Sequence, residues 1–412
     1  MPCASTGIAA TLLFDGTTAH RRFVIPMNVK DDTQVRHVTL GQSEILMAGD
    51  LIILDEVTPL NRDVFDYIDR MLRHVEQNAT LKELPFAGKI VIVGGDWKQT
   101  APVVTSKNFR VYDDNNMHNA QFNASIKNHK YFNGQHQHQF QTTRLTINNR
   151  IEPNQESFKD YLRMIGAGIK TMNFKERVVV PQNLQVTSIQ ALANFVFPPA
   201  AIKNPLNNLN VLKEAAILTP LNEEALKIND ILLEEMMGTT RVYPSIDQAH
   251  AERPEDMLAI NAADSNIENI YRKTPQGLPP HDLKLKEGSI MTIIRNLSVE
   301  SGLCNGTRVQ ITKLYPSNNI IKCRHINGPR GEKGEEFILG RFRFEFGGEE
   351  AAINGGGVQW TRVQFPLRPG LVLTINKAQG TTFCCFVLWL LFVWSTVQFR
   401  ADFITRWSCF GL

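Results

Sequence analysis

Two strings of residues, each at the end of an apolar run, carry the side chains needed to hold a metal ion and hydrolyse a nucleotide. Residues 51–54 are apolar and are followed directly by the carboxylates of Asp55 and Glu56. Residues 89–93 lead in the same way to Gly-Gly-Asp-Trp-Lys-Gln, which ends at Gln99. An aspartate at a strand end can hold Mg²⁺ through water, and the next carboxylate can deprotonate an attacking water. Because glutamine can bond both a γ-phosphate and that water, the two strings together indicate an NTP-hydrolysing site.

Each string also has a plainer interpretation. Asp55 and Glu56 could begin a helix, since the helix dipole favours acids in the first turn. The two glycines before Asp96 could form an ordinary turn. The joint occurrence of the strings favours the nucleotide site, although no glycine-rich loop ending in Gly-Lys-Thr precedes the acid pair.

Two further strings offer cations and polar groups to phosphate. Residues 145–149 are strand-like and lead to Arg150, which could stabilise charge developing on a γ-phosphate. A lone arginine is more often a surface charge. Residues 373–380 read Leu-Thr-Ile-Asn-Lys-Ala-Gln-Gly and predict a strand-to-helix turn that suits the phosphate of a nucleotide or of a nucleic-acid strand. A capped turn without a ligand is the alternative.

Small polar residues and glycines near the N-terminus suit a sugar–phosphate backbone. Residues 4–10 read Ala-Ser-Thr-Gly-Ile-Ala-Ala, and residues 15–20 read Asp-Gly-Thr-Thr-Ala-His. Such groups contact a nucleic-acid strand without reading its bases.

The pattern of apolar residues predicts an α/β fold. Residues 51–54 and 89–93 are typical of strands buried on both faces of a parallel sheet, and residues 64–75 have helical periodicity between them. We expect residues 105–140, which are rich in Asn, His and Gln, to be irregular. Helices are expected at 156–169 and 222–237, and strands at 215–218 and 371–375. From about residue 285, short apolar runs predict a small antiparallel barrel, at residues 289–294, 308–314, 319–323 and 336–339.

Length, net charge and cysteine content limit the classes of protein to which the chain can belong. The 412 residues suffice for two or three domains, and a net charge of +3 neither requires nor excludes a polyanionic partner. The six cysteines show no CxxC pair, which is typical of reduced thiols in an intracellular protein. The N-terminus lacks a signal-peptide pattern. The most apolar run, residues 383–394, is shorter than a membrane span and is expected to be a buried strand, so no membrane partner is predicted.

In this order the strings resemble the helicase motifs of the Pif-type (petite integration frequency) DNA helicases. The matching segments are residues 4–10, 16–20, 54–56, 94–99, 145–150 and 374–380. Residues 302–308, Gly-Leu-Cys-Asn-Gly-Thr-Arg, are similar to the Helitron-transposon branch of that family. The resemblance spans residues 4–382.

The resemblance implies two RecA-like P-loop NTPase domains with parallel sheets and a small inserted antiparallel β-barrel of the Src-homology-like kind. We expect the first domain at 1–140, the second at 141–284 with 366–412, and the barrel at 285–365. It further implies an ATP-dependent 5′ to 3′ DNA helicase with ATP and Mg²⁺ as cofactors. Its partners would be single-stranded and forked DNA, and it would act as a monomer in DNA repair, recombination and telomere maintenance. The nucleus is the expected compartment, with the mitochondrion as the alternative.

Carried over by matching position, the resemblance gives roles to individual residues. Asp55 would bind Mg²⁺, Glu56 would activate water, and Gln99 would sense the γ-phosphate. Arg150 would be the arginine finger. The remaining nucleotide contacts would be Gly95, Asp96 and Gly380, and the DNA contacts would be Ser5, Thr6, His20, Thr374, Asn376, Lys377 and Gln379.

Two departures from the family pattern change the expected activity. The family's phosphate loop lies upstream of the Ala-Ser-Thr-Gly string, which begins here at residue 4. The family's Ala-Leu-Ser-Arg helix is absent after residue 382, where the sequence is typical of translation in a shifted frame. We therefore expect a truncated copy that hydrolyses ATP weakly or not at all. The alternatives are a non-catalytic single-stranded DNA-binding relic of a transposon helicase, and an unrelated nucleotide-binding fold with chance motifs.

Overall fold

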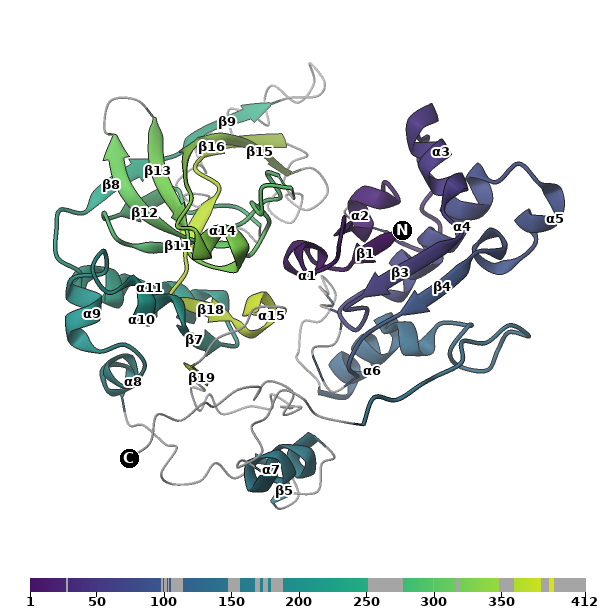
Figure 1. Ribbon diagram of the computed structural model, residues 1–412, viewed down its shortest axis with the longest axis horizontal. Coiled ribbons are helices and arrows are strands. Elements are labelled where there is room, and N and C mark those ends of the chain that lie inside the picture. Colours follow the sequence, from purple (N-terminus) through teal and green to yellow (C-terminus); the bar gives the residue numbers. More distant parts are fainter. Residues whose placement is uncertain are drawn as a thin grey trace. The chain divides into compact units, whose positions relative to one another are not determined.

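The chain forms two compact units, one of residues 1–185 with 391–412 and one of residues 186–390 (Figure 1). The computed structural model describes residues 1–26, 29–97, 99, 102, 104, 114–146, 156–166, 171–172, 177–178, 188–250, 277–298, 300–315, 319–347, 359–378 and 385–388. The three-part division expected from the sequence stays a prediction.

The first unit is built on a parallel sheet with strand order β2-β1-β3-β4. The strands are β1 (Pro2–Ala4), β2 (Thr17–Thr18), β3 (Leu51–Asp55) and β4 (Ile90–Val93). Ala4 lies opposite Asp55, and Leu54 lies opposite Val93. Because all four strands run the same way, their carboxyl ends meet at one edge of the sheet. The other described elements are α1 (Gly7–Thr11), α2 (Ala19–Arg22), α3 (Leu40–Ala48), α4 (Arg62–Val75), α5 (Ala79–Lys82), η1 (Pro85–Gly88), α6 (Asp114–Ala124), η2 (Ile126–Asn128), α7 (Glu156–Gly166), β5 (Thr171–Met172) and β6 (Arg177–Val178).

Helix α4 supplies a large part of the core of the first unit. Its N-cap is Asn61, whose side chain accepts a hydrogen bond from the N–H of Asp63, and Arg73 and His74 lie in its last turn. These residues complement the helix dipole at both ends. Its apolar positions recur every three or four residues and are buried in the same core cluster as β3, at Val64, Phe65, Ile68, Met71, Leu72 and Val75. The helix predicted over residues 64–75 is therefore confirmed.

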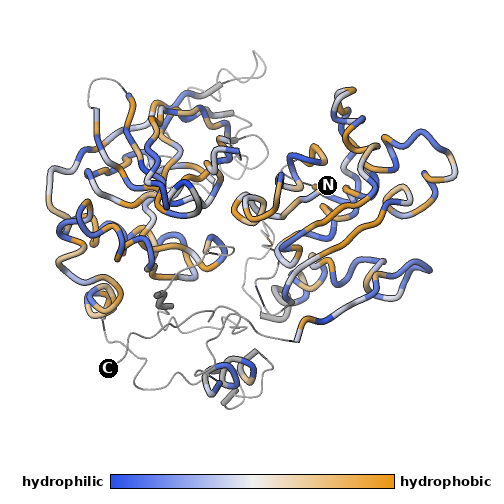
Figure 2. The backbone as a smooth tube through the Cα atoms, viewed as in Figure 1, coloured by the Kyte–Doolittle hydropathy of each residue, from blue (hydrophilic) through white to orange (hydrophobic). Residues whose placement is uncertain are grey.

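The strands β3 and β4 are covered on one face only, so the prediction of burial on both faces is wrong. Ile52 and Leu54 are buried in the core, whereas Ile90 and Ile92 are 64% and 51% exposed. Leu51 is exposed beside Ile90, since the two are register partners. Both strands are hydrophobic along most of their length, as Figure 2 shows. Composition alone therefore could not separate a covered face from an open one.

The expectation of irregular structure over residues 105–140 is also wrong in part. Residues 114–124 form α6 and residues 126–128 form η2. The helix consists mainly of Asn, Gln, His and Ala, so it has no clear apolar stripe in the sequence. Polar helices of this kind give no periodic signal, and their stability comes from the surrounding tertiary structure.

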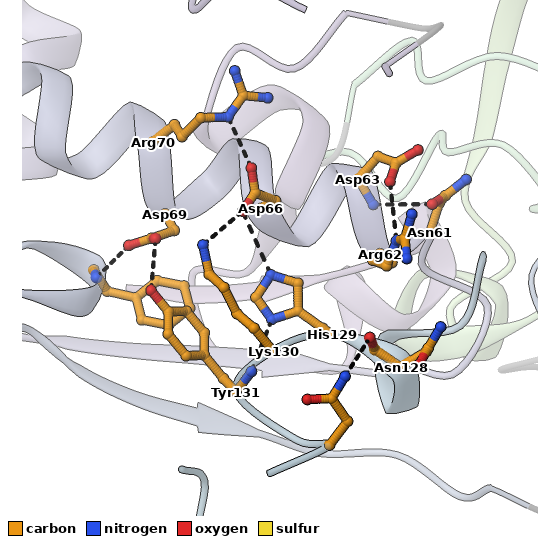
Figure 3. A network of polar contacts seen from close by, with 12 residues as sticks. Asn61, Arg62, Asp63, Asp66, Asp69, Arg70, Asn128, His129, Lys130 and Tyr131 are labelled. Carbon is orange, nitrogen blue, oxygen red and sulfur yellow. Dashed lines mark hydrogen bonds and ion pairs between the residues drawn. The ribbon is translucent and has the colours of Figure 1, made fainter. Parts of the chain in front are cut away.

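Two acids one turn apart on α4 tie the segment after η2 to that helix (Figure 3). Asp69 is 2% exposed and accepts hydrogen bonds from the Arg73 Nε (3.0 Å), the Tyr131 hydroxyl (2.9 Å) and the Phe86 N–H. Asp66 pairs with Arg70 (2.9 Å) and Lys130 (3.2 Å). Buried carboxylates are stable only when paired in this way.

The second unit contains a second parallel sheet, of order β18-β7-β19. Its strands are β7 (Ala215–Thr219), β18 (Val372–Thr374) and β19 (Cys385–Leu388). The strands predicted at 215–218 and 371–375 are thus present, and part of the run 383–394 is a strand. The described helices of this unit are α8 (Ile189–Val196), α9 (Pro199–Lys203), α10 (Leu209–Lys213), α11 (Asn222–Glu235), α14 (Gly328–Glu332) and α15 (Ile375–Ala378).

Antiparallel strands form the rest of the second unit and enclose a separate core. A five-stranded sheet has the order β14-β13-β12-β11-β17, and smaller sheets have the orders β15-β16-β9 and β10-β8. The bounds are β8 (Arg241–Pro244), β9 (Ile246–His250), β10 (Asp282–Leu285), β11 (Ile290–Ile293), β12 (Arg308–Tyr315), β13 (Ile320–His325), β14 (Glu336–Gly340), β15 (Phe342–Gly347), β16 (Gln359–Gln364) and β17 (Leu367–Pro369). One buried cluster draws residues from β8, β10, β11, β12, β13, β14 and β17. The predicted antiparallel barrel strands are therefore confirmed.

A buried arginine joins this barrel to the parallel sheet of the same unit. Arg308 begins β12 and is 2% exposed. Its guanidinium donates hydrogen bonds to the carbonyls of Leu212 (3.2 Å), Lys213 (3.0 Å), Ala215 (3.1 Å) and Gly370 (2.9 Å). The fixed fork of donors on arginine allows one side chain to satisfy several carbonyls at once.

Across the described part of the chain, no helix combines the length and the apolar character that crossing a membrane would require.

Replacement of Asp69 by alanine should strongly destabilise the first unit. The change leaves the Tyr131 hydroxyl, the Phe86 N–H and the Arg73 guanidinium without their shared acceptor, and such losses cost about 3 kcal/mol. Thermal or urea unfolding of the purified chain measures the effect. Asp63→Ala, on the same helix, is the matched control and should cost less than about 1 kcal/mol, because its ion pair with Arg62 is partly exposed. Equal losses of unfolding free energy in the two variants would contradict the structural role given to Asp69.

Acid should destabilise the fold through Asp66. Its pKa is held well below the usual value, first by the ring of His129, which lies 3.6 Å away, and then by Lys130 and Arg70, against the opposing effect of burial. A lowered pKa contributes stability above the unfolded-state value of about 3.9, and that contribution is lost as the pH falls. The urea midpoint should therefore drop between about pH 6 and about pH 3 by more in the wild type than in Asp66→Asn. Identical pH profiles would exclude this carboxylate as a cause.

Candidate functional site

Three parallel strands of the first unit end side by side, and the predicted catalytic residues follow them. β1 ends directly before Ser5, β3 ends at Asp55, and β4 ends directly before Gly94. The N–H of Ser5 donates to the Asp55 carbonyl (3.2 Å), and the N–H of Val57 donates to the Gly94 carbonyl (3.0 Å). These hydrogen bonds continue beyond the strand ends and bring the acid pair and the glycines to one edge of the sheet.

The carboxylate of Asp55 lies against Gly94. A Cβ atom built on Gly94 would be 2.8 Å from the Asp55 Oδ1, which is closer than a side chain allows. The same oxygen accepts the N–H of Glu56 at 2.9 Å. Gly95 is constrained as well, because a Cβ there would meet the side chains of Val57 and Thr58 at 3.2 Å each. The two glycines are therefore needed for the close approach of β4 to the acid pair. The half-exposed Asp55 carboxylate is a suitable oxygen ligand for Mg²⁺.

Glu56 has a left-handed backbone, with φ of +51°. This conformation costs a non-glycine residue roughly 1–2 kcal/mol, and residues held in it are common at functional sites. The hydroxyl of Ser5 donates a hydrogen bond to the Glu56 carbonyl, so β1 helps to hold the turn. The sequence has no glycine or asparagine at this position that would have predicted such a turn.

Asp96 and Gln99 lie in the turn that follows β4. The N–H of Gln99 donates to the Asp96 carbonyl at 2.9 Å, which closes the turn, and the Asp96 side chain is exposed. The structure thus brings Asp55, Glu56 and Gly95 to one edge of the sheet. Asp96 and Gln99 lie in the turn that follows Gly95.

The predicted DNA contacts of the first unit lie in the two short segments after β1 and β2. Thr6 caps α1, with its hydroxyl accepting the N–H of Ala9 at 3.2 Å. His20 lies in α2, two residues after the capping residue Thr18. Burial lowers the pKa of His20, which favours its neutral form. Ser5 and Thr6 therefore already serve the local fold, and their assignment to DNA stays a prediction.

In the second unit, Thr374, Asn376 and Lys377 follow one another at the carboxyl end of β18 and in α15. Two of them, Thr374 and Lys377, line a pocket within this unit. The complete lining is Asn222, Ala225, Leu226, Asn229, Thr292, Ile294, Asn305, Arg368, Pro369, Val372, Leu373, Thr374 and Lys377. The motif analysis did not assign Thr292 or Arg368, because each stands alone in the sequence among barrel residues.

Three predicted site residues lie outside the described residues, namely Arg150, Gln379 and Gly380. Their predicted roles as arginine finger, DNA contact and nucleotide contact stay predictions.

Two family models match the chain. One describes a PIF1-like helicase and matches residues 1–176, and the other describes the 2B domain of the DNA helicase Pif1 and matches residues 274–314. The ATP-dependent DNA helicase PIF1 of Xenopus laevis is 23% identical over 398 residues, which cover 96% of this chain and 51% of that protein. The corresponding helicase of Danio rerio is 22% identical over 348 residues, covering 84% and 43%. The chain thus spans about half the length of these curated relatives.

A solved structure supports the same fold. The Pif1 helicase from Bacteroides in complex with ADP-AlF3 and single-stranded DNA has a TM-score of 0.61 at 22% identity, with 98% of this chain and 80% of that chain covered. The likeness confirms the predicted fold, with RecA-like domains built on parallel sheets and an antiparallel barrel.

Replacement of Gly94 by alanine should displace the Asp55 carboxylate and destabilise the first unit by about 1–3 kcal/mol, because the new methyl group overlaps the Oδ1. Gly41→Ala is the matched control. No atom lies within 4 Å of a Cβ built there, and the position is inside α3, so the same change should stabilise by up to about 1 kcal/mol. Thermal unfolding of both variants measures the difference. Effects of equal sign would contradict the close packing described for Gly94.

Proposed function

This chain belongs to the PIF1-like helicase family, and we propose that it uses ATP hydrolysis to move 5′ to 3′ along single-stranded DNA and to unwind forked DNA. The observation that carries the proposal is the edge of the first parallel sheet. There the Asp55 carboxylate, which Glu56 follows, lies directly against Gly94. The Bacteroides relative was crystallised with ADP-AlF3 and single-stranded DNA, which supports both ligands for this chain.

Each group at this edge has a chemical task in the proposal. Asp55 would hold Mg²⁺, which supplies positive charge next to the phosphates of ATP. Glu56 would accept the proton of the attacking water, and its left-handed backbone would fix where the carboxylate begins. Gln99 would bond the γ-phosphate and the water, and Arg150 would stabilise the negative charge that develops in the transition state.

The DNA strand would be held through its backbone. Ser5, Thr6 and His20 in the first unit, and the Thr374–Gln379 segment in the second, offer hydroxyl, imidazole, amide and ammonium groups. Such contacts are independent of base sequence, as a helicase that travels along DNA requires. The nucleus, or alternatively the mitochondrion, stays the proposed compartment, with roles in DNA repair, recombination and telomere maintenance.

A second candidate function is DNA binding without hydrolysis. The 412 residues contain no Gly-Lys-Thr or Gly-Lys-Ser string, since Gly88-Lys89 is followed by Ile90. Such a string supplies the lysine and the hydroxyl that grip the triphosphate and its Mg²⁺. DNA affinity that is unaffected by ATP, in a chain that never turns ATP over, would favour this second function.

The Glu56→Gln variant tests the helicase proposal. It removes the general base but keeps the shape of the side chain, so ATP hydrolysis stimulated by single-stranded DNA should fall roughly 10²- to 10⁴-fold. The assay uses saturating ATP and long incubation, so that slow turnover is also measured. Phosphate release measures the hydrolysis rate. The affinity for a fluorescent oligonucleotide is measured in parallel and should be the same in the variant and the wild type.

Glu44→Gln is the control for this experiment. Glu44 is an exposed glutamate on α3, so the same loss of charge there should leave the hydrolysis rate at the wild-type level. Multiple turnovers that persist in Glu56→Gln would remove the acid pair from the mechanism and overturn the proposal.

A further inference from the structure

The turn between α1 and β2 holds an aromatic side chain almost entirely in solvent. Phe14 is 96% exposed, and the nearby Leu12 is 73% exposed. Burial of a phenylalanine ring is one of the largest single gains available in folding, and the fold forgoes it here. A single exposed apolar residue needs no explanation, but a ring that a rigid turn displays indicates a binding role.

The backbone of this turn fixes the position of Phe14. The N–H of Gly16 donates to the Leu13 carbonyl at 3.0 Å, which closes a turn with Phe14 and Asp15 at its centre. Asp15 has a left-handed backbone, with φ of +51°, a conformation that aspartate adopts more readily than most residues. Gly16 admits no side chain, because a Cβ there would overlap the Ala10 carbonyl oxygen. The turn is therefore packed tightly against α1.

Leu13 anchors the turn from the inside. It packs against the buried alanine cluster that joins α1 to β1, whereas Phe14, the next residue, is exposed. One side chain thus ties the turn to the first unit while its neighbour is left free to meet a ligand. The exposed ring is consequently a fixed feature of the fold.

The turn lies between the two segments of the first unit that are proposed to contact DNA. Ser5 and Thr6 precede α1, and His20 follows β2. α1 has 5 residues and β2 has 2, so these elements span only about 8 Å and about 7 Å. Phe14 therefore lies within the length of a few nucleotides of both segments.

The charges near the ring favour a nucleic-acid base over a phosphate at this point. Asp15 is exposed directly beside Phe14, and its carboxylate repels phosphate. Arg21, which is exposed on α2, attracts the strand as a whole. A phenylalanine ring stacks on any base, since every base has a π-face.

We propose that Phe14 stacks on a base of the bound single strand, while the segments around Ser5 and His20 hold the neighbouring sugar–phosphate backbone. The inference rests on the proposed function and adds a contact of a different kind. Stacking is tolerant of base sequence, and it neutralises no phosphate, so it adds little salt dependence. The ring thereby holds one base of the strand at a fixed place on the first unit.

The Phe14→Ala variant tests the proposal in the full chain. Its affinity for a fluorescent oligo-dT, measured by anisotropy, should fall roughly 5- to 100-fold, as loss of one aromatic stacking contact predicts. Leu12→Ala is the matched control, because it removes an exposed apolar side chain two residues earlier and should leave the affinity unchanged. Both variants should unfold at the wild-type temperature, since neither side chain is buried.

Three further comparisons separate stacking from other roles of the ring. Phe14→Trp should bind oligo-dT at least as tightly as the wild type, whereas Phe14→Leu, which is apolar without being aromatic, should bind as weakly as Phe14→Ala. An abasic oligonucleotide of equal length keeps the phosphates but has no bases, so the wild type and Phe14→Ala should bind it equally. The fold-loss for oligo-dT should be the same at about 50 mM and about 200 mM salt.

The outcomes distinguish failure of this inference from failure of the helicase proposal. Equal oligo-dT affinity in the wild type and Phe14→Ala would overturn the stacking contact alone, and a change of oligomeric state in that variant, seen by light scattering, would then assign the ring to a protein contact. An equal loss of affinity for the abasic oligonucleotide would also overturn stacking. A wild type that binds no oligo-dT would overturn both proposals. Base-dependent binding through Phe14 in a chain that never hydrolyses ATP would support the inference while the helicase proposal failed.

Discussion

The parallel register of β1, β3 and β4 is the constraint on which the candidate active site depends. The site residues lie at or directly after the ends of these strands. They are brought together because three strands end at the same height, and because backbone hydrogen bonds from Ser5 to Asp55 and from Val57 to Gly94 continue past the strand ends. A register slip of one residue would turn each side chain to the opposite face. The glycines after β4 allow the approach, and the left-handed Glu56 follows from it.

Periodicity and short motifs made much of this fold predictable. α4 has apolar residues at helical spacing throughout, and β7 is a short apolar run that the structure buries completely. The barrel strands were visible as short runs separated by turn residues. The acid pair and the Gly-Gly-Asp string indicated the correct edge of the sheet, because both follow apolar runs that the structure confirms as strands.

Other features depend on information that a single sequence does not carry. α6 is made of residues with no apolar stripe, so only its tertiary surroundings favour a helix there. The open face at Ile90 and Ile92 cannot be distinguished by composition from a covered one. The pairing of Thr292 with Arg368 joins strands that are far apart in the chain, and cross-strand register at such a distance leaves no local signal. The left-handed backbone of Glu56 likewise results from neighbouring strands.

The Arg308 guanidinium has a mechanical consequence for the second unit. Leu212 and Lys213, two of the carbonyl partners, lead into β7, and Ala215 is the first residue of that strand. The remaining partner, Gly370, lies two residues before β18. One barrel side chain therefore hydrogen-bonds the backbone at the start of β7 and shortly before β18. Pulling the barrel away from the sheet would break four hydrogen bonds together and leave a buried charge unsolvated. These shared contacts favour movement of the barrel and the parallel sheet of this unit as one body.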